Sequence, residues 1–402
     1  MGAVRDLAEE LWSGQKTTHA LQPVTTLLGL EPFGDGLAFL SSFANVVLLD
    51  TSEGLVLIDT GSFFLAGNNH ANVREWSQSP AKLAIYTHGH VDHAFGLEPF
   101  EAEARAEVIA HELVKDRFDR YQLTAGYNES INARQFGAAA WPKGYRYPDT
   151  TYRTSLTREI AGEKLELFHA RGETDDHTWV WLPERKVLCT GDLFIWASPN
   201  CGNPQKVQRF PREWARALRS MAALGPETLF PGHGMPILGK DRVEQALTET
   251  AELLETLVDQ TLALMNDGAR LDRVLAEVRA PDHLLERPYL RPVYDEPEFI
   301  VRNLWRLYGG WYDGNPARLK PPRDADVARE LAALSGGADK LAARAKELSA
   351  AGDHALACHL AELAVQADPA TRGIRSDVYL ARADSETSLM ARAVYRAAAD
   401  DK

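Results

Sequence analysis

The chain has 402 residues, of which 45% are apolar and 25% are charged, and this is the composition of an ordinary globular protein. Lysines and arginines number 44 against 57 aspartates and glutamates, which gives a formal net charge of −13. This negative balance excludes the basic footprint that nucleic acid or an anionic membrane surface requires, so we expect neither as a partner. At roughly 100–200 residues per domain, the length indicates two or three packed units.

The three cysteines, Cys189, Cys201 and Cys358, are widely spaced and include no C-x-x-C pair. This pattern favours neither a disulfide framework nor a cysteine-rich zinc site, and it is typical of a reducing compartment. The first residues form an acidic amphipathic stretch without the apolar region of a signal peptide, and no window is apolar over the ~18 residues that a membrane span needs. We therefore expect a soluble cytoplasmic protein with a helix over residues 1–23 and no membrane insertion.

Short apolar runs alternate with helical periodicity between residues 24 and 240. Strands are predicted at 44–49, 54–58, 82–86, 106–110, 164–168, 178–182, 186–189 and 228–230. Helices are predicted at 212–224 and 240–266, where apolar residues recur three and four positions apart. This alternation indicates an α/β fold of two or more layers.

Strand signals stop after residue 240, and the rest of the chain is predicted to be helical. Seven prolines between residues 281 and 323 exclude one long helix there, so this segment is expected to form short pieces. Leucines and alanines at helical spacing over 328–366 predict an antiparallel helix pair around a turn at Gly352. We therefore predict one domain over 1–240, a connecting segment over 241–327 and a helical domain over 328–402.

One loop concentrates side chains that bind metal ions. The predicted strand 82–86 is followed at once by Thr87-His88-Gly89-His90-Val91-Asp92-His93. Neutral imidazole and carboxylate are the ligands that zinc and similar ions prefer. Four such ligands on one short loop cannot all reach a single ion with good geometry, so we expect two ions about 3.5–4 Å apart. His88 and His90 can hold one ion, while Asp92 and His93 face the other.

Two ions require further ligands, and candidates follow other predicted strands. Glu173 and His177 come after the strand 164–168, Asp192 after 186–189, and His233 after 228–230. Since the ends of neighbouring strands meet at one edge of a sheet, we expect these side chains to converge with the loop 87–93.

The run Thr87–His93, with Leu55–Gly61 before it and Thr190-Gly191-Asp192 and Pro231-Gly232-His233-Gly234 after it, resembles the metallo-β-lactamase superfamily. This resemblance implies an αββα sandwich with a dinuclear metal site on one rim of its sheets. It also implies that the first ion is bound by His88 and His90, the second by Asp92, His93 and His233, and that Asp192 bridges them. Asp59 is similar to a carboxylate that orients a ligand imidazole in this superfamily.

The third ligand of the first ion departs from most of that superfamily. The common pattern is His-Thr-Pro-Gly-His, whereas residues 169–177 read His-Ala-Arg-Gly-Glu-Thr-Asp-Asp-His, so a glutamate takes the place of the ligand histidine. The zinc-dependent alkyl sulfatases of the superfamily are similar in using a carboxylate there. We expect Glu173 to be the ligand, with His177 as the alternative ligand or as an acid or hydrogen-bond donor.

A second stretch resembles the same branch. Residues 308–317, Tyr-Gly-Gly-Trp-Tyr-Asp-Gly-Asn-Pro-Ala, are similar to the segment that opens the dimerisation domain of alkyl sulfatases. The resemblance implies an all-α C-terminal domain and a homodimer formed through the C-terminal half. It also implies a two-zinc hydrolase that cleaves a small anionic alkyl sulfate ester with an apolar tail to an alcohol and sulfate.

The stretch after Asp192 departs from the alkyl sulfatase pattern. The family follows its bridging acid with an asparagine and an arginine that bind sulfate; Asn200 matches the asparagine, whereas Gln205 and Lys206 stand where the arginine is expected. We also expect this chain to lack the sterol-carrier-like domain that usually follows. A lactone, thioester, β-lactam or phosphodiester therefore stays open as the substrate, as do an iron-loaded redox site and a non-catalytic module. Aromatic candidates for a pocket wall are Phe63, Phe64, Tyr127, Phe194 and Trp196.

Overall fold

The computed structural model describes residues 2–21, 26–137 and 140–400. The chain separates into two compact units. Unit 1 comprises Met1–Ala125, Trp141–Ala269 and Arg273–Gly310, and unit 2 comprises Gly126–Ala140, Arg270–Asp272 and Trp311–Lys402. The domain boundaries expected at residues 240 and 327 stay a prediction.

The N-terminal stretch forms α1 (Ala3–Trp12) and the short α2 (Thr18–Leu21). The helix expected over residues 1–23 is interrupted, because α1 ends at Trp12, and Gly14 follows with a left-handed φ of 76°. Residues 1, 22 and 23 of that prediction lie outside the described residues.

Unit 1 contains two β-sheets. The first has the strand order β1-β2-β3-β4-β5-β6-β7, so each strand pairs with its neighbour in sequence. Its strands are β1 (Gly29–Gly34), β2 (Leu37–Ser41), β3 (Val46–Thr51), β4 (Gly54–Ile58), β5 (Ala81–Ile85), β6 (Glu107–His111) and β7 (Thr150–Tyr152). Pairing is antiparallel from β1 to β4 and parallel from β4 to β7.

The second sheet has the order β13-β12-β11-β10-β9-β8. Its strands are β8 (Ser155–Ile160), β9 (Glu163–His169), β10 (Thr178–Leu182), β11 (Val187–Ile195), β12 (Thr228–His233) and β13 (Ile237–Leu238). Only β11 and β12 pair in parallel among these described strands. β11 is buried along its whole length, which is typical of a central strand covered on both faces.

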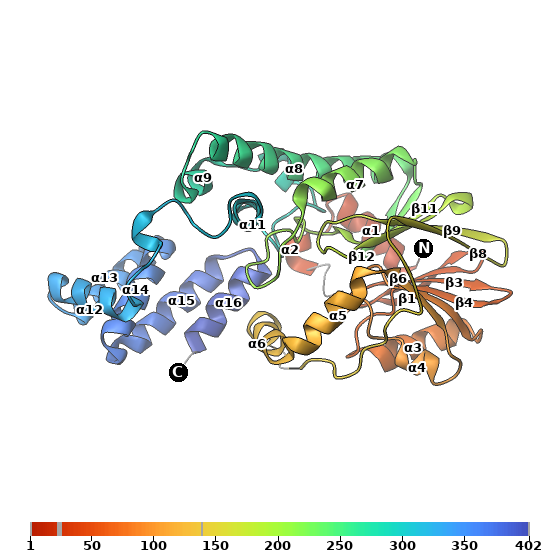
Figure 1. The fold of residues 1–402 in the computed structure, drawn as a ribbon, viewed down its shortest axis with the longest axis horizontal. Helices are drawn as coiled ribbons and strands as arrows, with labels where there is room; N and C mark the ends of the chain where they lie inside the picture. The colour runs from red at the N-terminus through yellow and green to blue at the C-terminus, as the bar shows by residue number, and fades with distance from the viewer. Residues whose placement is uncertain (1, 22–25, 138–139, 401–402) are drawn as a thin grey trace. The chain divides into compact units, whose positions relative to one another are not determined.

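Helices cover the outer faces of both sheets (Figure 1). α3 (Ala66–Trp76), α4 (Glu98–Glu101) and α5 (Leu113–Leu123) contribute Val73, Phe100 and Phe118 to one buried cluster with the first sheet. α7 (Pro211–Ala223) lies on the second sheet, where Trp214 Nε1 donates a hydrogen bond to the Leu193 carbonyl of β11 at 2.8 Å, and α8 (Lys240–Asn266) runs beside α7. The predicted αββα sandwich is confirmed.

Hydrogen bonds at one rim join the two sheets. The Asn45 side chain, in the loop after β2, donates from Nδ2 to the carbonyls of Pro231 and Gly234 at 3.0 and 2.9 Å. The Thr178 N–H at the start of β10 donates to the Thr87 carbonyl at 2.6 Å. These bonds bring the loop after β5, the start of β10 and the end of β12 together.

The segment after α8 forms the short helices α9 (Leu271–Glu277) and α10 (Asp282–Leu285) and the longer α11 (Pro297–Gly309). Pro297 occupies the first turn of α11, where its missing N–H is not needed. The expected division of this proline-rich segment into short pieces is confirmed.

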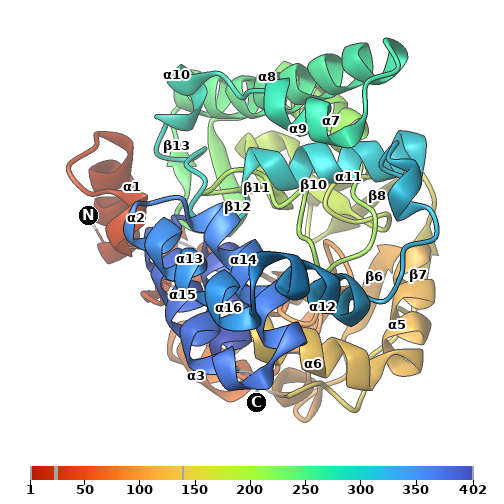
Figure 2. The ribbon, with the colours of Figure 1, turned by 90° about the vertical axis from the view of Figure 1, so that its left-hand side faces the viewer.

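The described secondary-structure elements of unit 2 are all helices. It contains α12 (Asp324–Ser335), α13 (Ala338–Ala350), α14 (His354–Ala367), α15 (Arg372–Ser385) and α16 (Leu389–Asp400), together with most of α6 (Ala125–Phe136). α13 and α14 are the predicted helix pair, and Figure 2 shows α13 to α16 side by side. Ala345, Leu348, Ala357 and Ala361 form its buried centre, where small side chains permit close packing. No helix among the described residues combines the length and apolar character needed to cross a membrane.

Candidate metal centre

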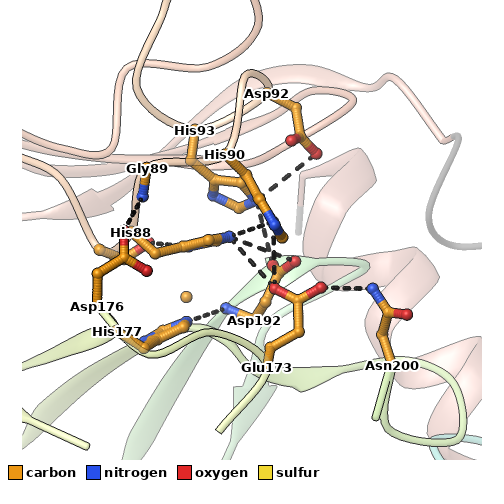
Figure 3. Close-up of polar contacts among 12 residues, drawn as sticks. His88, Gly89, His90, Asp92, His93, Glu173, Asp176, His177, Asp192 and Asn200 are labelled. Carbon is orange, nitrogen blue, oxygen red and sulfur yellow. Dashed lines mark hydrogen bonds and ion pairs between the residues drawn. The ribbon is translucent and has the colours of Figure 1, made fainter. Parts of the chain in front are cut away.

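The predicted site residues converge at the rim where the sheets are joined (Figure 3). His88, His90, Asp92 and His93 lie in the loop after β5, and Glu173 lies in the loop between β9 and β10. Asp192 belongs to β11, and His233 is the last residue of β12. Close approach requires glycine here, because a Cβ on Gly232 would lie 2.1 Å from Asp192 Oδ1.

The first donor group consists of His88, His90, Glu173 and Asp192, whose donor atoms lie within 4.8 Å of one another. Glu173 Oε2 lies 3.3 Å from His88 Nε2 and 3.3 Å from His90 Nδ1. The two imidazole nitrogens are themselves 2.8 Å apart. His177 does not belong to this group, so the geometry favours Glu173 over His177 as the third side chain of the first site.

The second donor group consists of Asp92, His93 and His233. Asp92 Oδ2 lies 3.3 Å from His233 Nε2 and 3.7 Å from His93 Nε2. Asp192 reaches both groups, because its Oδ1 is 3.2 Å from His93 Nε2 and its Oδ2 is 4.0 Å from His88 Nε2. This is the arrangement expected of a carboxylate between two ions.

Hydrogen bonds on the far ring nitrogens fix how the imidazoles point. Asp59 Oδ2 lies 2.7 Å from His93 Nδ1, and its two carboxylate oxygens also accept bonds from the N–H and hydroxyl of Thr87. Asp59 follows β4 with a left-handed φ of 60°. The carbonyl of Phe43 bonds His233 Nδ1. Both contacts place a proton on Nδ1 and leave Nε2 free to act as a ligand.

A buried ion pair holds the backbone between His88 and His90. Asp176 Oδ2 accepts a hydrogen bond from the Gly89 N–H at 3.0 Å and from Arg117 Nε at 2.8 Å. Burial opposes the charge on Asp176, but Arg117 outweighs it and holds the pKa of this carboxyl well below its ordinary range. A Cβ on Gly89 would lie 2.8 Å from Arg117 Cδ, so the loop needs glycine at this position.

His177 lies underneath the first group. Its ring stacks on His88 with centroids 4.7 Å apart, and its Nε2 accepts a hydrogen bond from the Asp192 N–H at 3.1 Å. Burial and the neighbouring His88 hold the pKa of His177 well below its ordinary value, so this ring is neutral. These contacts favour a positioning role over proton transfer to a substrate.

Asn200 and Arg209 both turn toward Glu173. Asn200 Nδ2 donates to Glu173 Oε1 at 2.5 Å, and Arg209 Nη1 lies 2.6 Å from the same oxygen. The predicted contact of Asn200 with a sulfate oxygen stays a prediction. Sequence reasoning missed Arg209, because a lone arginine 36 residues from its partner carries no periodic or motif signal.

The charges of the site compensate one another. Burial opposes the charge on His93 and His233, but surrounding carboxylates, Asp192 foremost, outweigh it; they hold the pKa of His93 well above its ordinary value and raise the pKa of His233 to about 10. Burial lowers the pKa of His90 to about 4. In the second group, protonated imidazoles thus supply the positive charge that balances buried carboxylates, and a metal ion would have to displace those protons.

The donor set fits two metal ions. His93 Nε2, Glu173 Oε2 and Asp192 Oδ1 are buried, and none has a hydrogen-bond partner among the described residues. Buried polar atoms that lie close to one another without hydrogen bonds are expected where a cation binds. Imidazole and carboxylate are the ligands of zinc and of iron, so the two groups define a dinuclear metal site without naming its metal.

The aromatic candidates for a pocket wall include both buried core residues and residues on the surface. Phe194 and Trp196 are each 1% exposed and belong to the core, where Trp196 Nε1 donates to the Met235 carbonyl. Phe64 is 58% exposed, and its ring is tilted by 30° against that of the half-buried Phe63, with centroids 3.9 Å apart, in the loop after β4. Tyr127 is exposed on α6, in unit 2.

Comparison with known proteins agrees with the fold and the donor groups. The model of the metallo-beta-lactamase superfamily matches residues 42–233 and that of alkyl sulfatase dimerisation matches residues 270–402. A linear primary-alkylsulfatase of Pseudomonas sp. is 29% identical over 80% of this chain, and an (R)-specific secondary-alkylsulfatase of Pseudomonas sp. is 27% identical over 83%. The solved structure of the inverting sec-alkylsulfatase Pisa1 from Pseudomonas sp. matches 92% of this chain with a TM-score of 0.83 at 24% identity.

The chain carries a domain of the metallo-beta-lactamase superfamily over residues 42–233, and its sandwich fold agrees with that match. Within that superfamily it falls in the alkyl sulfatase-like branch, because the dimerisation segment follows the sandwich. The chain spans 66% of the length of the linear primary-alkylsulfatase, 55% of the secondary-alkylsulfatase and 64% of Pisa1.

Proposed function

We propose that this protein is a two-zinc hydrolase that cleaves alkyl sulfate esters to an alcohol and sulfate. The observation that carries the proposal is the pair of donor groups that share Asp192, in a chain similar to alkylsulfatases over 80% of its length. The comparison supports the substrate class, and the donor groups support hydrolysis by a dinuclear site.

In this proposal each ion has its own set of side chains. His88, His90 and Glu173 hold the first ion, Asp92, His93 and His233 hold the second, and Asp192 lies between them. When bound, the two zinc ions would polarise an oxygen of the ester and lower the pKa of water toward ~7.

Residues behind the ligands keep them in place. Asp59 fixes the tautomer of His93, and the Arg117–Asp176 pair fixes the backbone at Gly89. His177 supports Asp192 by accepting a hydrogen bond from the Asp192 N–H. Lys206 is the cation we propose for an anionic substrate oxygen. A lysine would act there as a point charge instead of a two-pronged donor.

Assembly and location belong to the same proposal. The match of residues 270–402 to an alkyl sulfatase dimerisation segment supports a homodimer formed through the C-terminal half. Light scattering at micromolar concentration tests this, and a monomer mass would contradict it. Three buried free cysteines support a reducing, cytoplasmic location.

Sulfate release from a medium-chain alkyl sulfate tests the activity. We expect zinc-loaded protein to release sulfate, and chelator-treated protein and the Asp92→Ala variant to release none above background. Asp116→Ala, which removes an exposed carboxylate on α5, is the matched control and keeps full activity. If folded protein carrying two metal ions releases no sulfate, the sulfatase assignment is wrong while the dinuclear hydrolase stands.

Hydrolysis of another ester is the second candidate. It is favoured by Asn200 and Arg209, which bind Glu173 instead of facing outward as sulfate-binding groups. A panel of lactone, thioester, β-lactam and phosphodiester substrates tests it beside the alkyl sulfate. Metal analysis of the purified protein separates zinc from the iron-loaded alternative.

A further inference from the structure

The two carboxylate oxygens of Glu173 have different surroundings. Oε2 lies 3.3 Å from His88 Nε2 and 3.3 Å from His90 Nδ1, and it has no hydrogen-bond donor among the described residues. Oε1 accepts hydrogen bonds from Asn200 at 2.5 Å and from Arg209 at 2.6 Å. One oxygen therefore faces the first donor group, while the other binds an amide and a guanidinium.

Arg209 and Glu173 form a buried ion pair. Their side chains are 2% and 1% exposed, and Arg209 Nη1 also donates to the main-chain carbonyl of Glu173 at 2.5 Å. Within the described chain, Arg209 makes no ion pair with any other carboxylate. Because a buried charge without its partner is strongly unfavourable, the two side chains act as one neutral unit.

This pairing sets the charge that the first metal ion would meet. His88 and His90 are neutral as ligands, and a glutamate by itself would add one negative charge. The guanidinium cancels that charge, so the unit is electrostatically equivalent to a third imidazole. A less negative set of donors leaves a bound ion a stronger Lewis acid.

We propose that Arg209 is a positioning residue that restricts Glu173 to coordination through Oε2 and cancels its charge at the first metal ion. The inference rests on the proposed two-metal site and is independent of which ester is cleaved.

Substitution of Asn200 tests the positioning of Glu173 separately from the cancellation of its charge. It donates to the same oxygen as Arg209 but is neutral, so its removal loosens Glu173 without uncovering a charge. Removal of Arg209 uncovers the full negative charge while Asn200 still holds the carboxylate. The two substitutions therefore have different consequences for metal binding.

Zinc titration of chelator-stripped protein at pH 8, against a chromophoric competitor, tests the charge. We expect Arg209→Met to bind the first zinc ion at least about tenfold more tightly than the parent, since a nearby positive charge is removed. Arg209→Lys keeps the charge and should stay within about threefold of the parent, and Asn200→Ala should bind no more tightly than the parent. Weaker zinc binding by Arg209→Met, or equal tightening by Arg209→Lys, would overturn the proposal.

Thermal unfolding of the metal-free protein tests the pair without any metal. We expect Arg209→Met and Glu173→Gln each to lower the melting temperature, and the double variant to recover at least half of the larger loss, because both buried charges are then absent. A double variant that melts as low as the two single losses combined would show that the side chains are not coupled, and would overturn the proposal.

Hydrolysis separates this inference from the proposed function. With two zinc ions bound per chain, Arg209→Met should lower kcat about tenfold while Arg209→Lys keeps most of it. If the protein hydrolyses no alkyl sulfate, the zinc titration and the unfolding cycle still decide the role of Arg209.

Discussion

The rim of unit 1 and the helices of unit 2 differ in where they place charged side chains. At the rim, the side chains of Glu173, Asp192 and Arg117 are 1%, 5% and 1% exposed. In unit 2, the side chains of Arg344 and Glu347 are 60% and 65% exposed although they form an ion pair at 2.8 Å. The rim buries these three charged side chains, whereas the Arg344–Glu347 pair of unit 2 lies in solvent.

The difference shows what each region is built for. Exposed pairs three or four positions apart contribute little to stability, so unit 2 depends on its alanine- and leucine-rich packing. Buried charges are unfavourable unless every one of them is paired, so the rim depends on a complete network and on the cations it is built to bind. Substitutions should therefore affect metal content in one region and packing in the other.

The largest effect is expected for Asp192→Asn. The change removes the charge that lies between the two donor groups, so we expect the loss of at least one metal ion per chain and a fall in turnover on the order of 10³-fold. Elemental analysis and hydrolysis assays measure the two outcomes. Asp339→Asn, a 75% exposed carboxylate in unit 2, is the control and should change neither. Two retained ions with near-parental turnover would contradict the role of Asp192.

The Arg117 contacts offer a matched pair of substitutions. Asp176 is fully buried, and Asp176→Asn should lower the free energy of unfolding by about 3–5 kcal/mol because Arg117 loses its buried partner. Asp175 forms an ion pair with the same arginine but is 39% exposed. Asp175→Asn should therefore lower the free energy of unfolding by less than about 1 kcal/mol. Denaturant titration measures both.

The contribution of Asp176 to the free energy of unfolding should also depend on pH. Because its folded pKa is lowered, the stabilisation is present above the unfolded pKa of about 4 and is lost as the pH falls below it. Equal losses of unfolding free energy in Asp176→Asn and Asp175→Asn would show that burial does not make these two carboxylates differ in their contribution to stability.

Packing in unit 2 should matter to stability but not to metal binding. Leu348→Ala should lower the free energy of unfolding by about 2–4 kcal/mol, since the side chain lies in the buried cluster of α13, α14 and α15. Arg344→Ala, which breaks an exposed ion pair, should change it by no more than about 0.5 kcal/mol. Metal content should stay unchanged in both. A loss of metal from Leu348→Ala would mean that the two regions are not independent.

The smallest effect is expected from the titration of Lys206. Burial, followed by the neighbouring Arg209, lowers the pKa of Lys206 to about 8. Its ammonium is then present below pH 8 and lost above it, so KM for an anionic ester should rise a few-fold between about pH 8 and 10. Lys206→Gln should show a higher KM that does not change over this range. If the variant keeps the parental pH profile, Lys206 does not contact the substrate.

The titration of Lys206 should also change the stability of the folded protein. Substrate binding should weaken as the pH rises, whereas this contribution to stability should increase. An unfolded lysine holds its proton up to a pKa of about 10.4, so between pH 8 and that value the unfolded chain binds more protons than the folded one. This contribution therefore makes the folded protein more stable as the pH rises through that range.

Apolar runs predicted eight strands of the sandwich, while five described strands were missed: β1, β2, β7, β8 and the two-residue β13. The prediction at 54–58 coincides with β4 and that at 178–182 with β10. β1 was missed, because Pro32 and the glycines at 29 and 34 interrupt the apolar pattern and are typical of turns, whereas the apolar run of β2 was not recognised as a strand. β8 alternates exposed and half-buried residues at the edge of the second sheet, and β7 has three residues, so neither shows a core pattern.

The sequence by itself determined the chemistry of the site. Dense histidines and an aspartate after β5, with further acids and a histidine after later strands, predict a two-metal centre, because strand ends meet at one edge whatever the loops between them do. The tertiary structure decided which side chains stand behind those ligands. Glu173 and His177 are four residues apart; the sequence favoured Glu173 as the ligand, and the fold placed it among the donors and His177 beside the Asp192 N–H.

Arg117 and Arg209 show why the sequence alone did not reveal which side chains stand behind the ligands. Each neutralises a buried carboxylate that lies tens of residues away along the chain, at separations of 59 and 36 residues. A ligand is recognisable from its residue type and local spacing. The partner of a buried charge is fixed by burial and distance, and these exist only once the chain has folded.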